Sequence, residues 1–172
     1  MENVGIATGL MIVVIELRRL MLMSKMYMVI GAPGCGKSTY IQKHLKENEI
    51  VISRDKIRFS LLKDTDEYFS KEKEVYNEFI KQINAAIANN KDFYVDQTSL
   101  NAAARNKLFS RLTKKPNEII GIYFTTPLDI ILQRNSQRTG RALVPEDAVV
   151  NMFNSLTRPT LNEGFTEILE VE

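Results

Sequence analysis

The sequence predicts an α/β fold with three layers, in which helices cover both faces of a mainly parallel, five-stranded sheet. Five short apolar runs have the length and composition of buried strands: 26–30, 49–53, 93–95, 119–124 and 167–171. Helical patterns fill the intervals, and such alternation of strand and helix is typical of parallel sheets. With 172 residues, 44% of them hydrophobic and 26% charged, the chain has the size and composition of a single globular domain.

The helices are predicted from apolar spacing and from the residues at their starts. A long helix over 71–88 carries four apolar side chains at helical spacing: Val75, Phe79, Ile80 and Ile83. Shorter helices are predicted over 37–46, 55–62, 102–112, 128–136 and 145–156. Pro145 suits the first position of the last helix, where its missing N–H is not needed. Since ligands of such sheets bind at the carboxyl ends of the strands, the residues that follow the strands are the candidates for function.

The segment after the first strand fits the phosphate-binding pattern G-x-x-x-x-G-K-[ST] at every fixed position. Its glycines allow the backbone N–H groups to turn inward, where they and the helix N-terminus hold nucleotide phosphates. Lys37 would reach the β- and γ-phosphates, and the Ser38 hydroxyl would bind Mg²⁺. The loop residues predicted to bind ATP are Gly31, Gly34, Cys35, Gly36, Lys37, Ser38 and Thr39. A Gly/Pro turn without function is the alternative, but a strand before it and a helix after it favour the P-loop NTPase interpretation.

Bulk charge and cysteine content set weaker limits. The 23 basic and 21 acidic residues leave a net charge of +2, which neither requires nor excludes nucleic acid as a partner. Cys35 is the single cysteine of the chain, so no internal disulfide can form, and a reducing cytoplasm is the expected setting. A redox switch at Cys35 is conceivable, but a small side chain at a permissive loop position explains it equally well.

Residues 1–24 are predicted to be an extension of the catalytic domain, which would span 25–172. The apolar run over 9–15 is far shorter than the roughly 20 residues that span a bilayer. The segment also lacks the basic start and the cleavage site of a signal peptide, so no membrane association is predicted. Met21, Met23 and Met26 are possible later start sites, a choice that the sequence leaves open.

A carboxylate and an arginine follow the second predicted strand. Asp55 would lie at the carboxyl end of that strand, where it could accept the proton of a hydroxyl that attacks the γ-phosphorus. Arg58, three residues later, would share a helix face with it and could bind a phosphate of the acceptor. The alternative is that Asp55 caps a helix while Arg58 lies in solvent.

The third predicted strand ends at Asp96, followed by Gln97, Thr98 and Ser99. Asp96 is the acidic strand-end residue that could support Mg²⁺ from a neighbouring strand, as a ligand of its bound water. Thr98, with Asp96, is predicted to contact the acceptor, although Thr and Ser are also common turn residues. The next segment, 101–115, carries five basic residues and no acid: Arg105, Lys107, Arg111, Lys114 and Lys115. It could steer a polyanion or form a solvated helix face.

Arg134 and Arg138 lie four residues apart in a segment over about 134–145 that is predicted to form a mobile lid. A lid arginine that closes over the nucleotide can stabilise charge in the transition state and exclude water. Arg138 is predicted to be this catalytic residue, and Arg134 to assist or to stack on the adenine. The alternative is a basic surface helix.

Together these motifs resemble the kinase domain of the phage polynucleotide 5′-kinases, which are often fused to a 3′-phosphatase. The resemblance runs from about residue 25 to 156 and rests on four segments: 31–39, 53–58, 96–101 and 134–138 followed by Val144-Pro145. It implies an adenylate-kinase-like fold with a small helical lid. It further implies transfer of the γ-phosphate of ATP to the 5′-hydroxyl end of DNA or RNA. Asp55 would be the general base, with Arg58 on an acceptor phosphate and Lys37, Ser38 and Arg138 around the nucleotide.

Two departures accompany the resemblance. The family often has Asn where this chain has Ser99, which bears on contacts near the acceptor. The chain also has no Asp-x-Asp-x-Thr motif, so a phosphatase module is not expected. Two other functions stay open: a small-molecule kinase of the same fold that acts on a sugar, nucleoside or nucleotide-sugar, and a nucleotide-gated interaction module. A homo-oligomer is possible.

Overall fold

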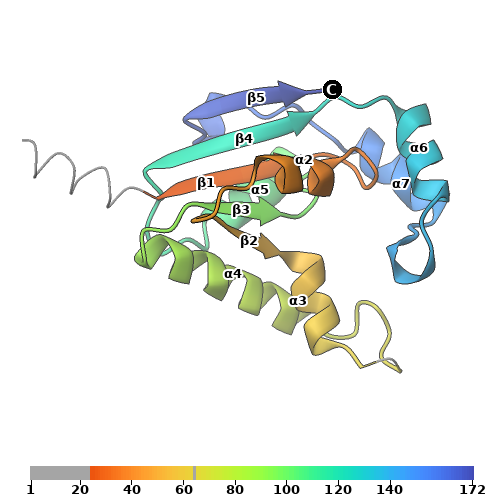
Figure 1. The fold of residues 1–172 in the computed structure, drawn as a ribbon, viewed down its shortest axis with the longest axis horizontal. Helices are drawn as coiled ribbons and strands as arrows, with labels where there is room; N and C mark the ends of the chain where they lie inside the picture. Colours follow the sequence, from red (N-terminus) through yellow and green to blue (C-terminus); the bar gives the residue numbers. More distant parts are fainter. Residues whose placement is uncertain (1–23, 64) are drawn as a thin grey trace, which may run out of the picture.

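The computed structural model describes residues 24–63 and 65–172, so nearly all of the predicted extension over 1–24 lies outside the described residues. The described chain forms one five-stranded sheet in the order β2-β3-β1-β4-β5 with every pairing parallel (Figure 1). The strands are β1 (Lys25–Ile30), β2 (Ile50–Ser53), β3 (Phe93–Asp96), β4 (Glu118–Phe124) and β5 (Glu167–Val171). The predicted fold class is confirmed.

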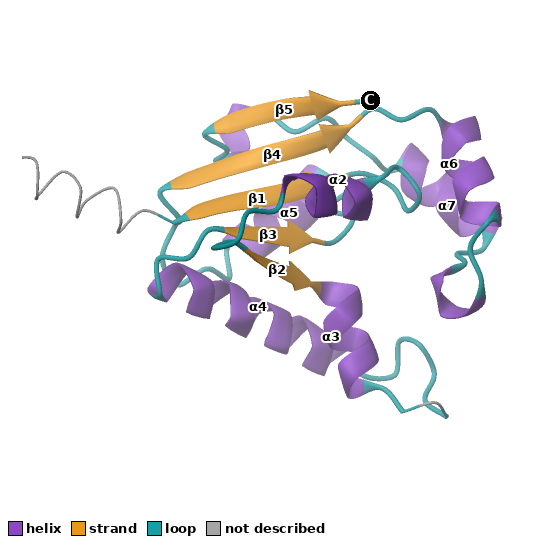
Figure 2. Ribbon diagram, in the orientation of Figure 1, coloured by secondary structure: helices purple, strands orange, loops and turns teal. Residues whose placement is uncertain are grey.

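Helices cover both faces of this sheet because successive strand residues point to opposite sides. Met26, Met28 and Ile30 of β1 pack with α4 (Glu72–Ala88) and α5 (Ala102–Phe109), whereas Val29 packs on the other face. That second face is covered by α2 (Lys37–His44), α6 (Leu128–Ser136) and α7 (Glu146–Asn154). In Figure 2, α2 lies in front of the sheet and α5 behind it. Two apolar clusters with the sheet between them therefore make the three layers.

The strands all point toward one edge, and this edge carries the candidate site. The phosphate loop leaves β1, and α3 (Arg54–Leu61) leaves β2 at the same edge, as do α6 and α7 beyond β4 (Figure 1). Two 3₁₀ turns complete the described elements, η1 (Gly140–Ala142) between α6 and α7 and η2 (Leu161–Glu163) before β5. None of the helices in 24–63 and 65–172 is long and apolar enough to cross a membrane.

Small shifts separate the predicted from the observed element boundaries. The helix predicted from Asp55 begins at Arg54, because Ser53 caps it by accepting a hydrogen bond from the Lys56 backbone N–H. The alternative in which Asp55 is the cap is therefore wrong, and Asp55 is the second residue of the helix. The third strand extends to Asp96, which pairs with Ser53 of β2.

Candidate active site

The phosphate loop is shaped by glycines that other residues could not replace. Gly34 and Gly36 have φ values of 94° and 106°, a left-handed conformation that L side chains rarely adopt. A Cβ atom on Gly34 would lie 2.8 Å from the Ile131 carbonyl oxygen of α6. A Cβ atom on Gly31 would lie 2.5 Å from the Cys35 sulfur. The loop is thus packed between β1 and α6 with its backbone close to both.

The loop and the start of α2 fit a nucleotide phosphate chemically. The N-terminus of α2 has no side-chain cap and no acidic residue in its first turn, so its backbone N–H groups are suited to an anion. Lys37 Nζ donates to the carbonyl oxygens of Gly31 (2.9 Å) and Ala32 (2.8 Å), which keeps the cation over the loop. Ser38 is exposed in the first turn of α2, so its hydroxyl is accessible to a Mg²⁺ that accompanies the phosphates.

The end of β3 lies against this loop. The Gly31 backbone N–H donates to the Thr98 carbonyl oxygen at 3.0 Å, so Thr98 supports the loop through its main chain. Burial raises the pKa of Asp96, while a hydrogen bond with Ser53 and the positive charge of Lys37 oppose that rise. Asp96 pairs with Ser53 at the end of β2, and Asp55 follows Ser53 by two residues, so both carboxylates lie at the same edge of the sheet.

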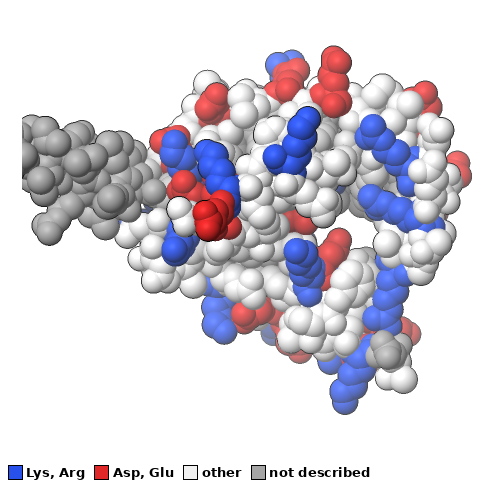
Figure 3. Space-filling view, viewed as in Figure 1, with Lys and Arg blue, Asp and Glu red and all other residues white. Residues whose placement is uncertain are grey.

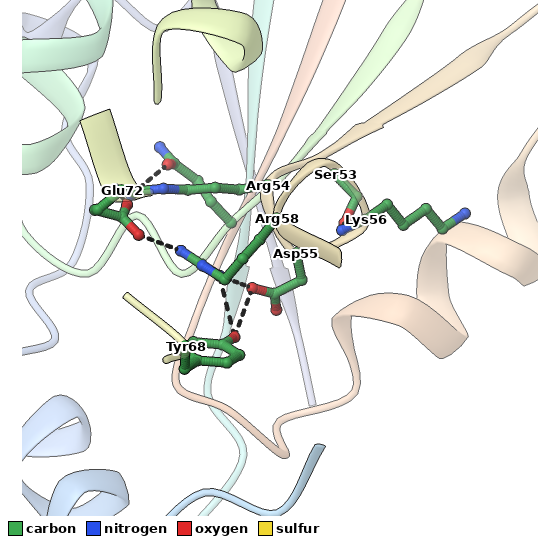
Figure 4. A network of polar contacts seen from close by, with 8 residues as sticks. Ser53, Arg54, Asp55, Lys56, Arg58, Tyr68 and Glu72 are labelled. Carbon is green, nitrogen blue, oxygen red and sulfur yellow. Dashed lines mark hydrogen bonds and ion pairs between the residues drawn. The ribbon is translucent and has the colours of Figure 1, made fainter. Parts of the chain in front are cut away.

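Asp55 is held in a network that the sequence did not reveal (Figure 4). Its side chain is 66% exposed, and it forms an ion pair with Arg58, whose side chain is 6% exposed. The Tyr68 hydroxyl donates to the same Asp55 oxygen at 3.1 Å and accepts from Arg58 at 3.0 Å. The exposed carboxylate is therefore fixed from behind by a buried cation and from the side by a phenol.

Glu72, the first residue of α4, joins two arginines of α3. Its carboxylate accepts from Arg58 at 2.8 Å and forms a second ion pair with Arg54. Partial burial alone would raise the pKa of Glu72, but the hydrogen bond from Arg58 and the charge of Arg54 hold it below its ordinary value. Arg54 also donates to Gln97 beyond β3, at 3.4 Å. The ionised Glu72 thus ties α3 to α4 directly behind Asp55.

This arrangement has chemical consequences for the roles of Asp55 and Arg58. Asp55 combines an accessible carboxylate with a fixed orientation, which is what a general base requires. Arg58, predicted to bind an acceptor phosphate, instead directs its guanidinium to Asp55, Tyr68 and Glu72. Its phosphate-binding role stays a prediction, and the contacts that the structure gives it position Asp55.

The two arginines of the predicted lid, Arg134 and Arg138, contact different parts of the molecule. Arg134 of α6 donates to the Cys35 carbonyl oxygen of the phosphate loop at 3.5 Å. Arg138 instead donates to the Ala142 carbonyl oxygen at 3.5 Å, within the lid itself. The side chain of Asn135 is buried and donates to Val144 at 2.7 Å, which closes the lid segment on itself. Arg134 is thus the arginine that lies over the loop, whereas the predicted action of Arg138 would need the lid to move.

The basic segment over 101–115 is not the uniform charged face that the sequence allowed. Arg105 is fully buried and forms a two-pronged ion pair with Glu163 at 2.7 and 2.9 Å. It therefore belongs to the scaffold. Lys107, Arg111, Lys114 and Lys115 are exposed, so any steering of a polyanion would fall to these four.

Ser99, the departure from the resembled family, occupies an unusual backbone position. Its φ is 49°, a left-handed value in which Asn is favoured over most residues, and its buried hydroxyl has no hydrogen-bond partner in the described chain. The left-handed backbone conformation therefore explains why the resembled family often has Asn where this chain has Ser99.

Tyr68 and Glu72 are the site residues that sequence reasoning missed. Tyr68 lies in a loop without periodicity, and Glu72 resembles an ordinary acid in the first turn of a helix. Ten and fourteen residues separate them from Arg58, so no local spacing connects them to it.

Comparison with known proteins shows which family this chain belongs to. A sequence profile of the family described as "AAA domain" matches residues 26–159, which include the phosphate loop, Asp55 and α6. The chain belongs to this family. The phosphate loop inside the matched residues makes it a P-loop domain of this family.

Among curated proteins, the chain is similar to the L-seryl-tRNA(Sec) kinase of Methanococcus maripaludis. The two are 28% identical over 140 residues, which cover 75% of this chain and 51% of that protein. The chain thus spans about half the length of this curated relative.

Two solved structures show how widely the fold is shared. The structure titled as the Pnkp1/Rnl/Hen1 RNA repair complex matches with a TM-score of 0.67 and 20% identity, covering 78% of this chain and 44% of that one. A gluconokinase from Sinorhizobium meliloti matches with a TM-score of 0.57 and 18% identity, covering 86% and 81%. At these identities, the two structures establish the fold alone.

Proposed function

We propose that the protein transfers the γ-phosphate of ATP to the 5′-hydroxyl end of DNA or RNA, with Asp55 as the general base. The observation that carries this proposal is the exposed Asp55 carboxylate, held by Arg58 and Tyr68 at the edge of the sheet that also bears the phosphate loop. A base in that position would meet a hydroxyl in line with a nucleotide bound on the loop.

Each residue would contribute one step of the transfer. Asp55 accepts the acceptor's O–H proton as the new O–P bond forms and the bond to the β–γ bridging oxygen breaks, which releases ADP. Lys37 and Arg134 neutralise charge on the phosphates, while Ser38, supported by Asp96, would hold Mg²⁺. Mg²⁺ with ATP would supply an activated and charge-shielded phosphoryl group.

Two features support a nucleic-acid acceptor. The space-filling view is hollowed between the α3 side and the α6–α7 side of the molecule, and Lys and Arg side chains lie on both sides of the hollow (Figure 3). Such a surface suits a polyanion. The M. maripaludis relative is, by its name, a kinase of a tRNA-linked substrate.

A small-molecule kinase is the second candidate, and the engagement of Arg58 favours it. Because Asp55, Tyr68 and Glu72 occupy its guanidinium, Arg58 is not a ready phosphate ligand for a charged acceptor. An uncharged sugar or nucleoside needs no cation from the protein, so the engagement of Arg58 does not hinder its binding.

Transfer of labelled γ-phosphate from ATP with Mg²⁺ tests the proposal. The acceptors are a single-stranded oligonucleotide with a 5′-hydroxyl, the same strand with a 5′-phosphate, and a nucleoside without any phosphate. Label confined to the 5′-hydroxyl strand supports the proposal. Equally efficient labelling of the nucleoside would assign the site to small molecules, and ATP binding without any labelling would point to a nucleotide-gated module.

A further inference from the structure

Three aromatic side chains gather beside the network of Asp55. Phe59 of α3 is 43% exposed, and Phe69, in the segment between α3 and α4, is 69% exposed. Tyr68 lies between them, with its ring centre 4.7 Å from that of Phe69 and 6.1 Å from that of Phe59. Both ring pairs are close to perpendicular, at 87° and 68°, so the rings do not stack on one another. We call these three residues the aromatic platform.

The aromatic platform is joined to the proposed base by direct contacts. The Tyr68 hydroxyl is 3.1 Å from an Asp55 oxygen. The Arg58 guanidinium carbon lies 4.6 Å from the ring centre of Tyr68 and 5.5 Å from that of Phe69, within the range of cation–π contact. A group that presents its hydroxyl to Asp55 therefore has this platform next to it.

Exposure alone would not make a site, since single apolar residues are common on protein surfaces. Here, two separate segments bring their aromatic rings to one place, and Leu61 adds a fourth partly exposed apolar side chain nearby in sequence. Phe69 is the most exposed of the large hydrophobic residues in the described chain. Such clustering at a candidate site is characteristic of ligand contact.

We propose that the aromatic platform stacks on the nucleobase that carries the reactive 5′-hydroxyl. This inference rests on the proposed function and names how its acceptor is held. Flat, exposed rings suit a nucleobase, because every base has a π-face that stacks on aromatic side chains. Charge supports the same occupant, because exposed Lys56 and Lys63 flank the platform in sequence and would meet phosphodiester groups rather than an apolar protein surface.

The proposal predicts a specific kind of selectivity. Stacking is tolerant of base identity, so the protein should require a base at the 5′ nucleotide without a strong preference for which one. The effect should appear in KM, because the platform contacts the acceptor and not the transferred phosphate. Removing one ring is expected to raise KM about tenfold.

The absence of tryptophan from the chain allows a clean experiment. Phe69→Trp places one tryptophan on the platform, and its fluorescence is followed during titration with a 5′-hydroxyl oligonucleotide and with the same strand lacking its 5′ base. We expect strong quenching by the complete strand and weak quenching by the abasic one. In parallel, Phe69→Ala should raise KM for the complete strand about tenfold with kcat unchanged, and leave the abasic strand unaffected. Leu161→Ala is the matched control, because Leu161 is 58% exposed and belongs to η2.

The outcomes separate this inference from the proposed function. If the wild-type protein labels 5′-hydroxyl strands but both strands quench equally and Phe69→Ala keeps its KM, the aromatic platform is overturned while the kinase function stands. If no 5′-hydroxyl strand is labelled at all, the proposed function fails and this inference fails with it. Self-association that Phe69→Ala abolishes, with no response to oligonucleotide, would instead assign the platform to a second copy of the chain.

Discussion

Two buried arginines in this protein make different use of similar chemistry. Arg105 is fully buried between α5 and η2, and its hydrogen-bonding nitrogens all have partners: Glu163 and the carbonyl oxygens of Ser99, Leu100 and Thr157. Arg58 is 5% exposed, but it pairs with a carboxylate that faces solvent, and its Nε has no hydrogen-bond partner among the described residues. The network around Arg105 is therefore closed, meaning that all of its donors are paired in the interior. The network around Arg58 is open, meaning that it includes a carboxylate that faces solvent at the candidate site.

The difference separates a scaffold from a site. A buried charge whose donors are all satisfied has nothing left to offer a ligand, and it fixes the chain segments that surround it. The guanidinium of Arg58 is occupied as well, but its partners include the solvent-facing carboxylate of Asp55, so its contacts hold a group that a ligand can reach. On this basis Arg105 stabilises the fold, whereas Arg58 orients Asp55.

Removal of Arg105 is expected to give the largest loss of stability. Arg105→Met would leave Glu163 without its cation and three carbonyl oxygens without a donor, and should lower the free energy of unfolding by about 3–5 kcal/mol. Urea denaturation followed by circular dichroism measures this. Arg111→Gln, an exposed basic residue just beyond α5, is the control and should stay within about 0.5 kcal/mol of wild type. Equal effects of the two substitutions would remove the contrast between closed and open networks.

Arg58→Lys should act mainly on turnover. A lysine cannot bond to Asp55, Tyr68 and Glu72 at once in the geometry of a guanidinium. We expect kcat to fall about tenfold or more while the free energy of unfolding falls by about 1–2 kcal/mol. Rates of γ-phosphate transfer and urea denaturation on the same preparation measure both. A loss of stability as large as that of Arg105→Met, with kcat unchanged, would make Arg58 a scaffold residue as well.

The pH dependence of stability gives a smaller effect with a definite sign. The hydrogen bonds from Arg105 hold the pKa of Glu163 below its ordinary value of 4.5. The ion pair therefore contributes its full stability above about pH 4.5 and loses it as the pH falls through the lowered pKa.

Glu163→Gln should lose this contribution at neutral pH and show a shallower decline of stability with acid than wild type does. Denaturation between about pH 3 and pH 6 tests the prediction, because that range brackets the ordinary carboxyl pKa. Parallel acid profiles of the two proteins would show that Glu163 does not titrate with folding.

How far the sequence predicted this molecule depends on the range of the interactions. The five strands, the phosphate loop and Asp96 at a strand end follow from local patterns that the structure confirms. Both interpretations of 101–115, a polyanion-binding face and a solvated helix face, are wrong at Arg105, because nothing within the segment indicates that this cation meets Glu163, 58 residues later. Tyr68 and Glu72 were missed for the same reason, since tertiary packing of α3 on α4 brings them to Arg58.

The lid shows a different limit. The four-residue spacing predicted that Arg134 and Arg138 share a helix face, but α6 ends at Ser136 and Arg138 lies in the turn after it. Spacing also does not tell which of the two arginines reaches the phosphate loop. The Gly34–Ile131 approach sets how α6 lies on the loop, and that approach depends on the packed structure.

The most direct test of the account is γ-phosphate transfer by Asp55→Asn, measured together with its ATP binding. Asn is nearly isosteric but cannot accept the proton of the attacking hydroxyl, so the account predicts a loss of kcat of about 10²–10⁴-fold with ATP affinity unchanged. Transfer to a 5′-hydroxyl oligonucleotide at the wild-type rate, or a loss of ATP binding, would contradict the assignment of Asp55 as the base.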